Sequence, residues 1–377
     1  MSREALIVGA GETPYVRHPG EAATTPRLAA QAARAALASA GLAPRDVDGL
    51  GVASFSLAPD RAIDLAFRLG LRPRWLMDGM TGGASGIDML QHARRAIEAG
   101  DASAILLVAA DRFGDDDFVR LVDEFNTATR DYLAPIPAGG PNALFALLAL
   151  RHMRATGLDR SAYGAVAVAQ REWAAGNPNA AYRKPLTLKA YLEAPVVADP
   201  LTIYDCVPVV AGADAIVLAA EGESPVRVRA LAALHNADHQ DGDGLTTGLR
   251  ELRDGLWAEA SAGPDEVDVV SVYDDYTAMV LVQLEDLGFV RDGDLERLVG
   301  ERIVPRSLPV NTSGGQLSAG QAGAAGGMHG LVEVVTQLRG NAGSRQVADA
   351  RLGVVAGYGM VAYRYGACAN AAVLERA

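Results

Sequence analysis

The sequence predicts an α/β protein built from two duplicated βαβ halves, which form a layered α-β-α-β-α sandwich. Stretches with apolar residues at helical spacing each lead into short strands of Val, Ile, Leu and Ala, which is typical of strands buried on both faces. The same order occurs twice, because residues 25–54 and 245–275 share a helix–break–strand scheme, down to APRDVDGLGV against GPDEVDVVSV. We therefore expect a first half over residues 1–225 and a second half over residues 226–377.

Further helix–strand units follow in each half. The segment ALIVGAG predicts a buried first strand, and residues 83–100 predict a helix that leads into the strand SAILLVAADR. Residues 323–340 are the matching helix of the second half and lead, after a polar stretch, into RLGVVAGYGM. Residues 112–200 differ, because proline and glycine punctuate them; they contain a buried helix, ALFALLALRHMRATG, and a helix that ends at Gly176. We expect this insertion to form a substrate channel or lid.

The composition favours a soluble, cytoplasmic protein. Half of the 377 residues are hydrophobic, aromatic residues are few and the net charge is −12. Such a chain can bury a large core of small side chains, but it lacks the basic surface that nucleic acid or an anionic membrane requires. No apolar run reaches the roughly 18 residues that span a bilayer, and the N-terminus has no signal-peptide pattern. The two cysteines, Cys206 and Cys368, are too few for a disulfide framework, and each is expected to be a small core residue.

The most informative segment is NTSGGQLSAGQAGAAGG, residues 311–327. Asn311 ends a predicted strand, and a run of glycine and alanine then opens a helix. Only small residues let a backbone pass close to a ligand while its N–H groups and the helix N-terminus point at developing negative charge. The segment therefore predicts a site that stabilises an anion.

Three segments, together with the duplication, resemble the thiolase superfamily, and especially its sterol-carrier-protein thiolase branch. They are ALIVGAGETPYVR, which resembles the first strand of the family, PVVADPLTIYDCVPVVAGADAIVLAAE, which resembles the end of its first half, and the segment 311–327, which resembles its active-site loop. The resemblance covers essentially the whole chain. It implies the thiolase fold and a homodimer.

The residues that carry thiolase chemistry are replaced at each matching position. Gly83 stands at the position of the acyl-carrying cysteine, and Gln321 stands at the position of the Gly-His-Pro histidine. Val355 falls where the second cysteine is expected, and Tyr273-Asp274 falls on the acid/base pair of the second half. The resemblance therefore implies the fold without thiolysis through an acyl-cysteine.

A cysteine-free offshoot of the superfamily matches more closely. The run Tyr273-Asp274-Asp275-Tyr276-Thr277, followed by LEDLGF at 284–289, resembles thiolase-like aldolases that cleave the side chain of steroid CoA thioesters. The resemblance implies carbon–carbon cleavage of a β-hydroxyacyl-CoA, tyrosine for proton transfer, and a small OB-fold/zinc-ribbon partner protein. Gln321 stands where these aldolases have a second tyrosine, and we expect it to position the substrate by hydrogen bonding.

The predicted site combines residues from both halves. We expect a CoA thioester as substrate, no tightly bound cofactor and no metal, since His235 and His239 lie in a loop without a convincing third ligand. Glycine N–H groups suit the oxyanion of a thioester enolate, and a tyrosine is a natural acid for it. The expected catalytic residues are Tyr273, Asp274 and Gln321, and the expected oxyanion- or substrate-binding residues are Gly83, Ser85, Asn311, Gly357, Tyr358, Gly359 and His329.

Other interpretations stay open. The chain is alternatively an acyl-CoA acyltransferase with Ser85 as nucleophile, or a non-catalytic subunit that binds acyl-CoA. Asp274 and Asp275 are alternatively caps of the helix that follows them, and Arg183 and Lys184 are a solvated loop rather than a phosphate site.

Overall fold

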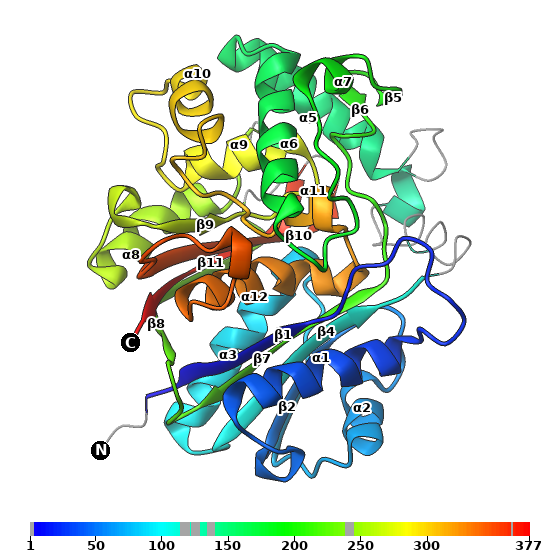
Figure 1. Cartoon of the computed structure of the whole chain (residues 1–377), viewed down its shortest axis with the longest axis vertical. Coiled ribbons are helices and arrows are strands. Elements are labelled where there is room, and N and C mark those ends of the chain that lie inside the picture. Colours follow the sequence, from blue (N-terminus) through cyan, green and yellow to red (C-terminus); the bar gives the residue numbers. More distant parts are fainter. Residues whose placement is uncertain (1–3, 114–120, 122–128, 134–139, 238–244, 363–364) are drawn as a thin grey trace.

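The protein forms one continuous mixed sheet flanked by helices (Figure 1). The computed structural model describes residues 4–113, 121, 129–133, 140–237, 245–362 and 365–377. The first half supplies β3 (Trp75–Asp78), β2 (Gly49–Ala53), β4 (Ala104–Asp111), β7 (Gly212–Ala219) and β1 (Leu6–Glu12), in that spatial order. The second half continues the sheet with β8 (Val226–His235), β11 (Tyr365–Arg376), β10 (Leu352–Ala362) and β9 (Val269–Ser271).

The predicted layering is confirmed. α1 (Thr25–Ala40) and α2 (Arg61–Leu69) cover the outer face of the first-half strands. α3 (Ser85–Ala99) and α12 (Gly326–Leu338) contact each other and lie between the strands of the two halves. α8 (Leu249–Ala260) and α9 (Thr277–Asp286) cover the outer side of the second half, which completes the α-β-α-β-α order. The two halves join where β1 pairs with β8, through Leu6 opposite Arg227 and Ile7 opposite Val226.

Small side chains make these layers possible. A Cβ atom on Gly9 of β1 would lie 2.3 Å from the carbonyl oxygen of Ala36 in α1, so an alanine-rich helix packs directly on a glycine strand. In the middle layer, a Cβ on Gly86 of α3 would lie 2.3 Å from the carbonyl oxygen of Gly327 in α12. The two helix starts therefore meet backbone to backbone.

The described part of the insertion is helical. It contains α5 (Pro141–Thr156), α6 (Arg160–Ala175), α7 (Leu188–Leu192) and the small sheet of β5 (Val196–Ala198) and β6 (Leu201–Thr202). The predicted buried helix and the helix that ends at Gly176 are confirmed. α6 packs on α9 and on the short α11 (Gly315–Ala319), so the insertion covers the loop 311–321. Much of the predicted lid, within residues 114–139, lies outside the described residues.

α10 (Leu295–Leu298) lies at the periphery of the second half. Among the described residues, no helix is both long and apolar enough to cross a membrane.

Candidate active site

Tyr273 fills the space that a nucleophile on Gly83 would occupy. It is the second residue after β9, and Gln283 of α9 fixes its backbone by accepting from Tyr273 N at 3.2 Å and donating to Tyr273 O at 2.6 Å. A Cβ on Gly83 would lie 2.3 Å from both Cε2 and Cζ of the Tyr273 ring and 2.1 Å from the carbonyl oxygen of Tyr358. The phenol therefore stands at the start of α3, where the family's cysteine would stand, and only glycine fits beneath it.

Gln321 holds the phenol rather than standing free. Its backbone is fixed by Gln321 N donating to the carbonyl of Pro208 at 2.8 Å, and its carbonyl accepts from Val210 N at 3.1 Å. Its side-chain Nε2 donates to the Tyr273 hydroxyl oxygen at 2.9 Å. Because the phenol oxygen accepts this bond, its own proton is left to donate elsewhere. Burial raises the pKa of Tyr273 above its usual range and the charge of Asp275 adds to the rise, while the Gln321 bond lowers it.

Asp274 fixes the loop 311–321 from below. Its carboxylate accepts from Gln316 N at 2.9 Å, from Leu317 N at 3.2 Å and from Gln170 Nε2 at 2.6 Å. The interpretation that it caps the following helix is wrong, because α9 has no side-chain cap and the carboxylate instead binds the first N–H groups of α11. Burial raises the pKa of Asp274 to about 7 against these hydrogen bonds. Asp274 is thus a positioning residue for the loop that carries Gln321.

Asp275 is a buried carboxylate without a complete set of partners. Its residue is only 7% exposed, and its Oδ1 has no hydrogen-bond partner among the described residues. Burial and the neighbouring charge of Asp274 raise the pKa of Asp275 well above its usual range. Its carbonyl accepts from Val207 N at 3.3 Å, so the backbone here is fixed, while Oδ1 of the carboxyl group keeps an unused acceptor site among the described residues.

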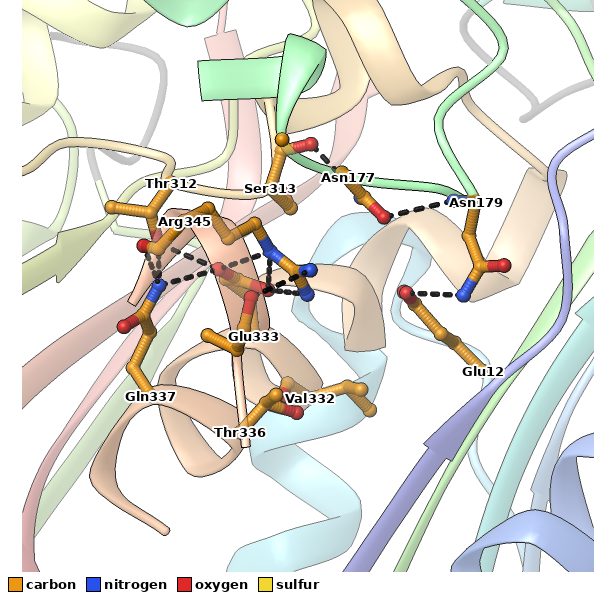
Figure 2. Close-up of polar contacts among 12 residues, drawn as sticks. Glu12, Asn177, Asn179, Thr312, Ser313, Val332, Glu333, Thr336, Gln337 and Arg345 are labelled. Carbon is orange, nitrogen blue, oxygen red and sulfur yellow. Dashed lines mark hydrogen bonds and ion pairs between the residues drawn. The ribbon is translucent and has the colours of Figure 1, made fainter. Parts of the chain in front are cut away.

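The loop that leads into α11, residues 311–314, is braced by a buried ion pair (Figure 2). Arg345 Nη2 donates to Glu333 Oε2 at 2.8 Å, and Thr312 Oγ1 donates to Glu333 Oε1 at 2.7 Å. Asn311 has a left-handed backbone, and its Oδ1 accepts from Val272 N at 2.9 Å while its buried Nδ2 has no partner among the described residues. The predicted strand-end Asn311 therefore ties the loop to the segment that carries Tyr273.

The start of α3 is a close-packed backbone platform. A Cβ on Gly357 would lie 2.3 Å from Asn370 Oδ1 and one on Gly359 would lie 2.2 Å from the Thr81 carbonyl oxygen, so β10 passes directly beneath this helix start. Ser85 is fully buried and its hydroxyl accepts from Thr81 N at 3.0 Å. Among the described residues, no hydrogen bond joins Ser85 to a histidine or lysine, so no base activates it as a nucleophile.

Tyr358, predicted to bind substrate, has a packing role. Its side chain is fully buried, and its hydroxyl accepts from Gly366 N across the β10–β11 hairpin. Its carbonyl oxygen, not its phenol, faces Gly83.

The other sequence candidates lie away from this constellation or are inert. Cys368 is buried and Cys206 half-buried, and burial raises the pKa of their thiols to about 11 and about 12. Arg183 and Lys184 are exposed, and His235 is an exposed strand end. His239 lies outside the described residues.

His329 is buried in a polar cluster that the sequence did not predict. Its ring nitrogens lie 2.6 Å from Tyr15 Oη and 2.7 Å from Ser313 Oγ, and the Tyr15 hydroxyl also contacts Asp214 and Glu12. Asp214 interrupts the otherwise apolar strand GADAIVLA, which was the available signal. The cluster links β1, β7 and α12 beneath the loop 311–315.

The arrangement suits proton transfer next to an anion-stabilising helix start. A neutral phenol whose oxygen is held by an amide can donate its proton, and backbone N–H groups at a helix start can hold an enolate oxygen. A nucleophile is missing at the matching position, because Gly83 has no side chain.

The comparisons with known proteins agree with this description. Residues 230–374 match the family model described as thiolase C-terminal domain-like. The chain is 32% identical, over 96% of its length and 98% of the relative's, to a 17-hydroxy-3-oxo-4-pregnene-20-carboxyl-CoA lyase from Mycobacterium tuberculosis. It is 29% identical, over 94% of its length and 95% of the relative's, to a steroid side-chain-cleaving aldolase from Thermomonospora curvata. A solved structure described as an Ltp2-ChsH2(DUF35) aldolase superposes with a TM-score of 0.81 at 25% identity, covering 99% of this chain and 98% of that one.

Proposed function

The chain belongs to the thiolase superfamily, and from this premise we propose that it is a carbon–carbon lyase that cleaves a β-hydroxyacyl-CoA of the steroid side-chain type by a retro-aldol reaction. The observation that carries the proposal is the Tyr273 phenol in the place of the acyl-cysteine. Relatives that match almost the whole chain are named as a lyase of a hydroxylated steroid carboxyl-CoA and as a side-chain-cleaving aldolase.

The reaction needs two proton transfers and no external reagent. A base takes the proton of the β-hydroxyl group, the bond between the α and β carbons breaks, and its electron pair forms the thioester enolate. The β carbon leaves as a ketone, and the α carbon then receives a proton to give the shortened acyl-CoA. Atoms and electrons balance without an oxidant or free CoA.

Each step has a candidate group in the site. Tyr273 is neutral at physiological pH, because its pKa is raised, so it is the proton donor to the enolate carbon. Asp275 lies two residues after this tyrosine and has a buried oxygen without a partner among the described residues, so its carboxylate is the candidate acceptor of the hydroxyl proton. The burial that raises its pKa makes the ionised form a stronger base, and return of the proton from Asp275 to Tyr273 restores the site for the next turnover. N–H groups at the start of α3 would hold the enolate oxygen, and Gln321 would keep the phenol oriented.

Thiolysis requires a cysteine that this site excludes. A side chain on Gly83 would overlap the Tyr273 ring, so the chain cannot carry an acyl group at that position without losing its tyrosine. The retro-aldol reaction asks only for proton transfer and enolate stabilisation, which the described residues can supply.

We propose a partner protein of the kind that a solved relative has. The solved Ltp2-ChsH2(DUF35) aldolase supports a small partner protein of the DUF35 class, with an OB fold and zinc ribbon, for this chain. A homodimer and a CoA thioester as substrate, with no tightly bound cofactor, complete the proposal.

The test is to supply the complex of the chain and its DUF35-class partner with a steroid CoA thioester that carries a hydroxyl group on the β carbon. We expect a steroid ketone and a shortened acyl-CoA in equal amounts, with a rate that does not depend on added CoA. Cleavage that requires free CoA and yields two thioesters would mean thiolysis and would contradict the proposal.

A further inference from the structure

A buried cluster beneath the active-site loop brings together four side chains with metal-ligating atoms. Tyr15 Oη lies 2.7 Å from Asp214 Oδ1, 2.6 Å from His329 Nδ1 and 3.1 Å from Glu12 Oε2. The ligand atoms of Glu12, Asp214 and His329 all lie within 4.8 Å of one another. These residues come from the end of β1, the turn after it, β7 and α12, so the fold and not a local motif assembles them.

Hydrogen bonding alone leaves the cluster incomplete. A phenol has one proton, so Tyr15 can donate to only one of its two carboxylate neighbours. The second oxygen of Asp214, Oδ2, is fully buried and has no partner among the described residues. No ion pair joins Glu12 or Asp214 to an arginine or lysine in the part of the chain that the structure describes. The partly buried carboxylate of Glu12 and the buried carboxylate of Asp214 therefore share a space with no cationic side chain bound to them among the described residues. Burial raises the pKa of Glu12 and the charge of Arg345 opposes this rise, but the ion pair of Arg345 is with Glu333.

Outer contacts orient the ligands as they do around protein-bound metals. Asn179 Nδ2 donates to Glu12 Oε1 at 2.8 Å, which leaves Oε2 facing the cluster, and Asn177 in turn orients Asn179 (Figure 2). The far nitrogen of His329, Nε2, is 2.7 Å from Ser313 Oγ, which fixes the ring while Nδ1 faces inward. Metal-binding histidines and carboxylates carry such second contacts, which set the orientation and basicity of the ligand atom.

We propose that Glu12, Tyr15, Asp214 and His329 form a site for a divalent transition-metal ion, of the class of Zn²⁺ or Mn²⁺. Ligand atoms about 2.0–2.2 Å from a tetrahedral metal such as Zn²⁺ lie roughly 3.3–3.5 Å apart. To reach that spacing, the three contacts of Tyr15 Oη need to lengthen by a few tenths of an ångström to about an ångström, and the ligand atoms of Glu12, Asp214 and His329, which lie within 4.8 Å of one another, need to approach by up to about 1.5 Å. Two carboxylates neutralise a divalent charge, the imidazole favours Zn²⁺ over Mg²⁺ or Ca²⁺, and the carboxylate oxygens also suit Mn²⁺. Glu12 is only partly buried, which leaves a route for the ion to enter.

The ion would brace the loop that carries Gln321. His329 contacts Ser313, and Ser313 Oγ accepts from the N–H of Gly315, the first residue of α11, at 3.2 Å. A metal bound here would join β1, β7 and α12 at one point and hold this end of the loop from below. Its role is structural, because the Tyr273 hydroxyl is not among the atoms of the cluster.

The test measures metal in the full-length, untagged protein. Elemental analysis after purification in buffer supplied with Zn²⁺ and Mn²⁺ should find about one ion per chain. Asp214→Asn should lower this content at least about tenfold. Asp275→Asn is the matched control, because it also neutralises a buried carboxylate with an unpaired oxygen but lies outside the cluster, and it should keep the ion.

A second measurement covers the case in which Asp214→Asn does not fold. Chelator-treated wild-type protein should rise in melting temperature by several degrees on addition of Zn²⁺ or Mn²⁺ and not of Mg²⁺, and Co²⁺ should give the visible absorption of a tetrahedral site. Metal that persists in Asp214→Asn, or wild-type protein that neither holds these ions nor responds to them, would overturn the proposal and mean that the two carboxylates share a proton instead.

Discussion

Each half of the molecule contains a helix that begins after a glycine-containing turn, and the two helix starts have different roles. α3 begins after the turn Gly82–Ala84, and α12 begins after the turn Gly323–Ala325. At the first start, Gly83 offers only its backbone, because the Tyr273 ring and the Tyr358 carbonyl occupy its side-chain space. The second start follows a loop whose Gln321 side chain binds the same phenol.

The difference shows how a duplicated scaffold changes its chemistry without changing its fold. Two strand-end carboxylates anchor the glycine-rich segment of the second half: Asp111 at the end of β4 accepts from Ala324 N at 2.8 Å, and Asp274 after β9 accepts from Gln316 N at 2.9 Å. Both anchors act on the loop of the second half. The first half thus supplies a bare backbone platform, while the second half supplies the titratable groups.

The largest effect should come from adding a side chain at Gly83, at the start of α3. Gly83→Cys places a Cβ within 2.3 Å of the Tyr273 ring and the Tyr358 carbonyl, so it should abolish cleavage, by about 1,000-fold or more, and lower stability by about 1–3 kcal/mol. Single-turnover rates and thermal unfolding measure both. The control is Gly255→Ala in α8, where a Cβ has open space, and it should keep the activity and leave the stability unchanged or higher. A Gly83→Cys protein that gains thiolysis and keeps its stability would contradict the steric exclusion.

The second largest effect should come from removing the Asp274 carboxylate, which anchors the loop of the second half. Asp274→Ala leaves the buried N–H groups of Gln316 and Leu317 and the Gln170 amide without their acceptor, so it should cost about 2–4 kcal/mol of unfolding free energy. Asp294→Ala is the matched control, because Asp294 caps the exposed α10 by accepting from Arg297 N at 2.8 Å. That change should cost about 1 kcal/mol. Equal losses in chemical unfolding would mean that Asp274 is an ordinary helix cap.

A smaller effect should follow from removing the hydrogen bond that orients the Tyr273 phenol. Gln321→Ala removes the amide that donates to Tyr273 Oη at 2.9 Å, so the pKa of the phenol should rise further and its orientation should be lost. We expect about a tenfold lower single-turnover rate with unchanged binding of a non-cleavable CoA ester. A change confined to binding would restore the role predicted from the sequence, in which Gln321 positions the substrate.

No effect is expected from the cysteines. Burial raises the pKa of Cys206 to about 12 and that of Cys368 to about 11, so both thiols stay protonated, and weakly nucleophilic, until the pH approaches those values. Iodoacetamide at pH 7.5 should leave cleavage intact, and so should the double change Cys206→Ser and Cys368→Ser. Rapid inactivation from which substrate protects the enzyme would place a thiolate in the mechanism.

Local pattern predicted the helix starts and the tyrosine well. The repeated helix–strand scheme gives the layers, and the run Tyr273-Asp274 after an apolar strand places a phenol at the strand end, where the structure also has it. These features depend on residues that are neighbours in the sequence. Periodicity and motif are sufficient for them.

Contacts between segments that lie far apart in the chain could not be predicted from the sequence. The sequence indicated that Asp274 is a catalytic residue or, alternatively, a cap of the helix next to it, but the fold brings α11, 42 residues away, onto its carboxylate. Tyr15 lies 199 residues from Asp214 and 314 residues from His329, so no spacing rule could reveal their cluster. Tyr358 looked like a pocket residue from its glycine neighbours, but strand alternation and the hairpin turn its ring into the core.

The most direct test of the account is Tyr273→Phe, because it removes one hydroxyl group and leaves the ring that packs on Gly83. Single-turnover cleavage of a β-hydroxyacyl-CoA should slow by about 100- to 10,000-fold, while calorimetric binding of a non-cleavable analogue stays unchanged. A tyrosine that only packs would lose about 0.5–1.5 kcal/mol of stability and little rate. Turnover of the variant at nearly the wild-type rate would contradict proton transfer by Tyr273 and place the chemistry elsewhere.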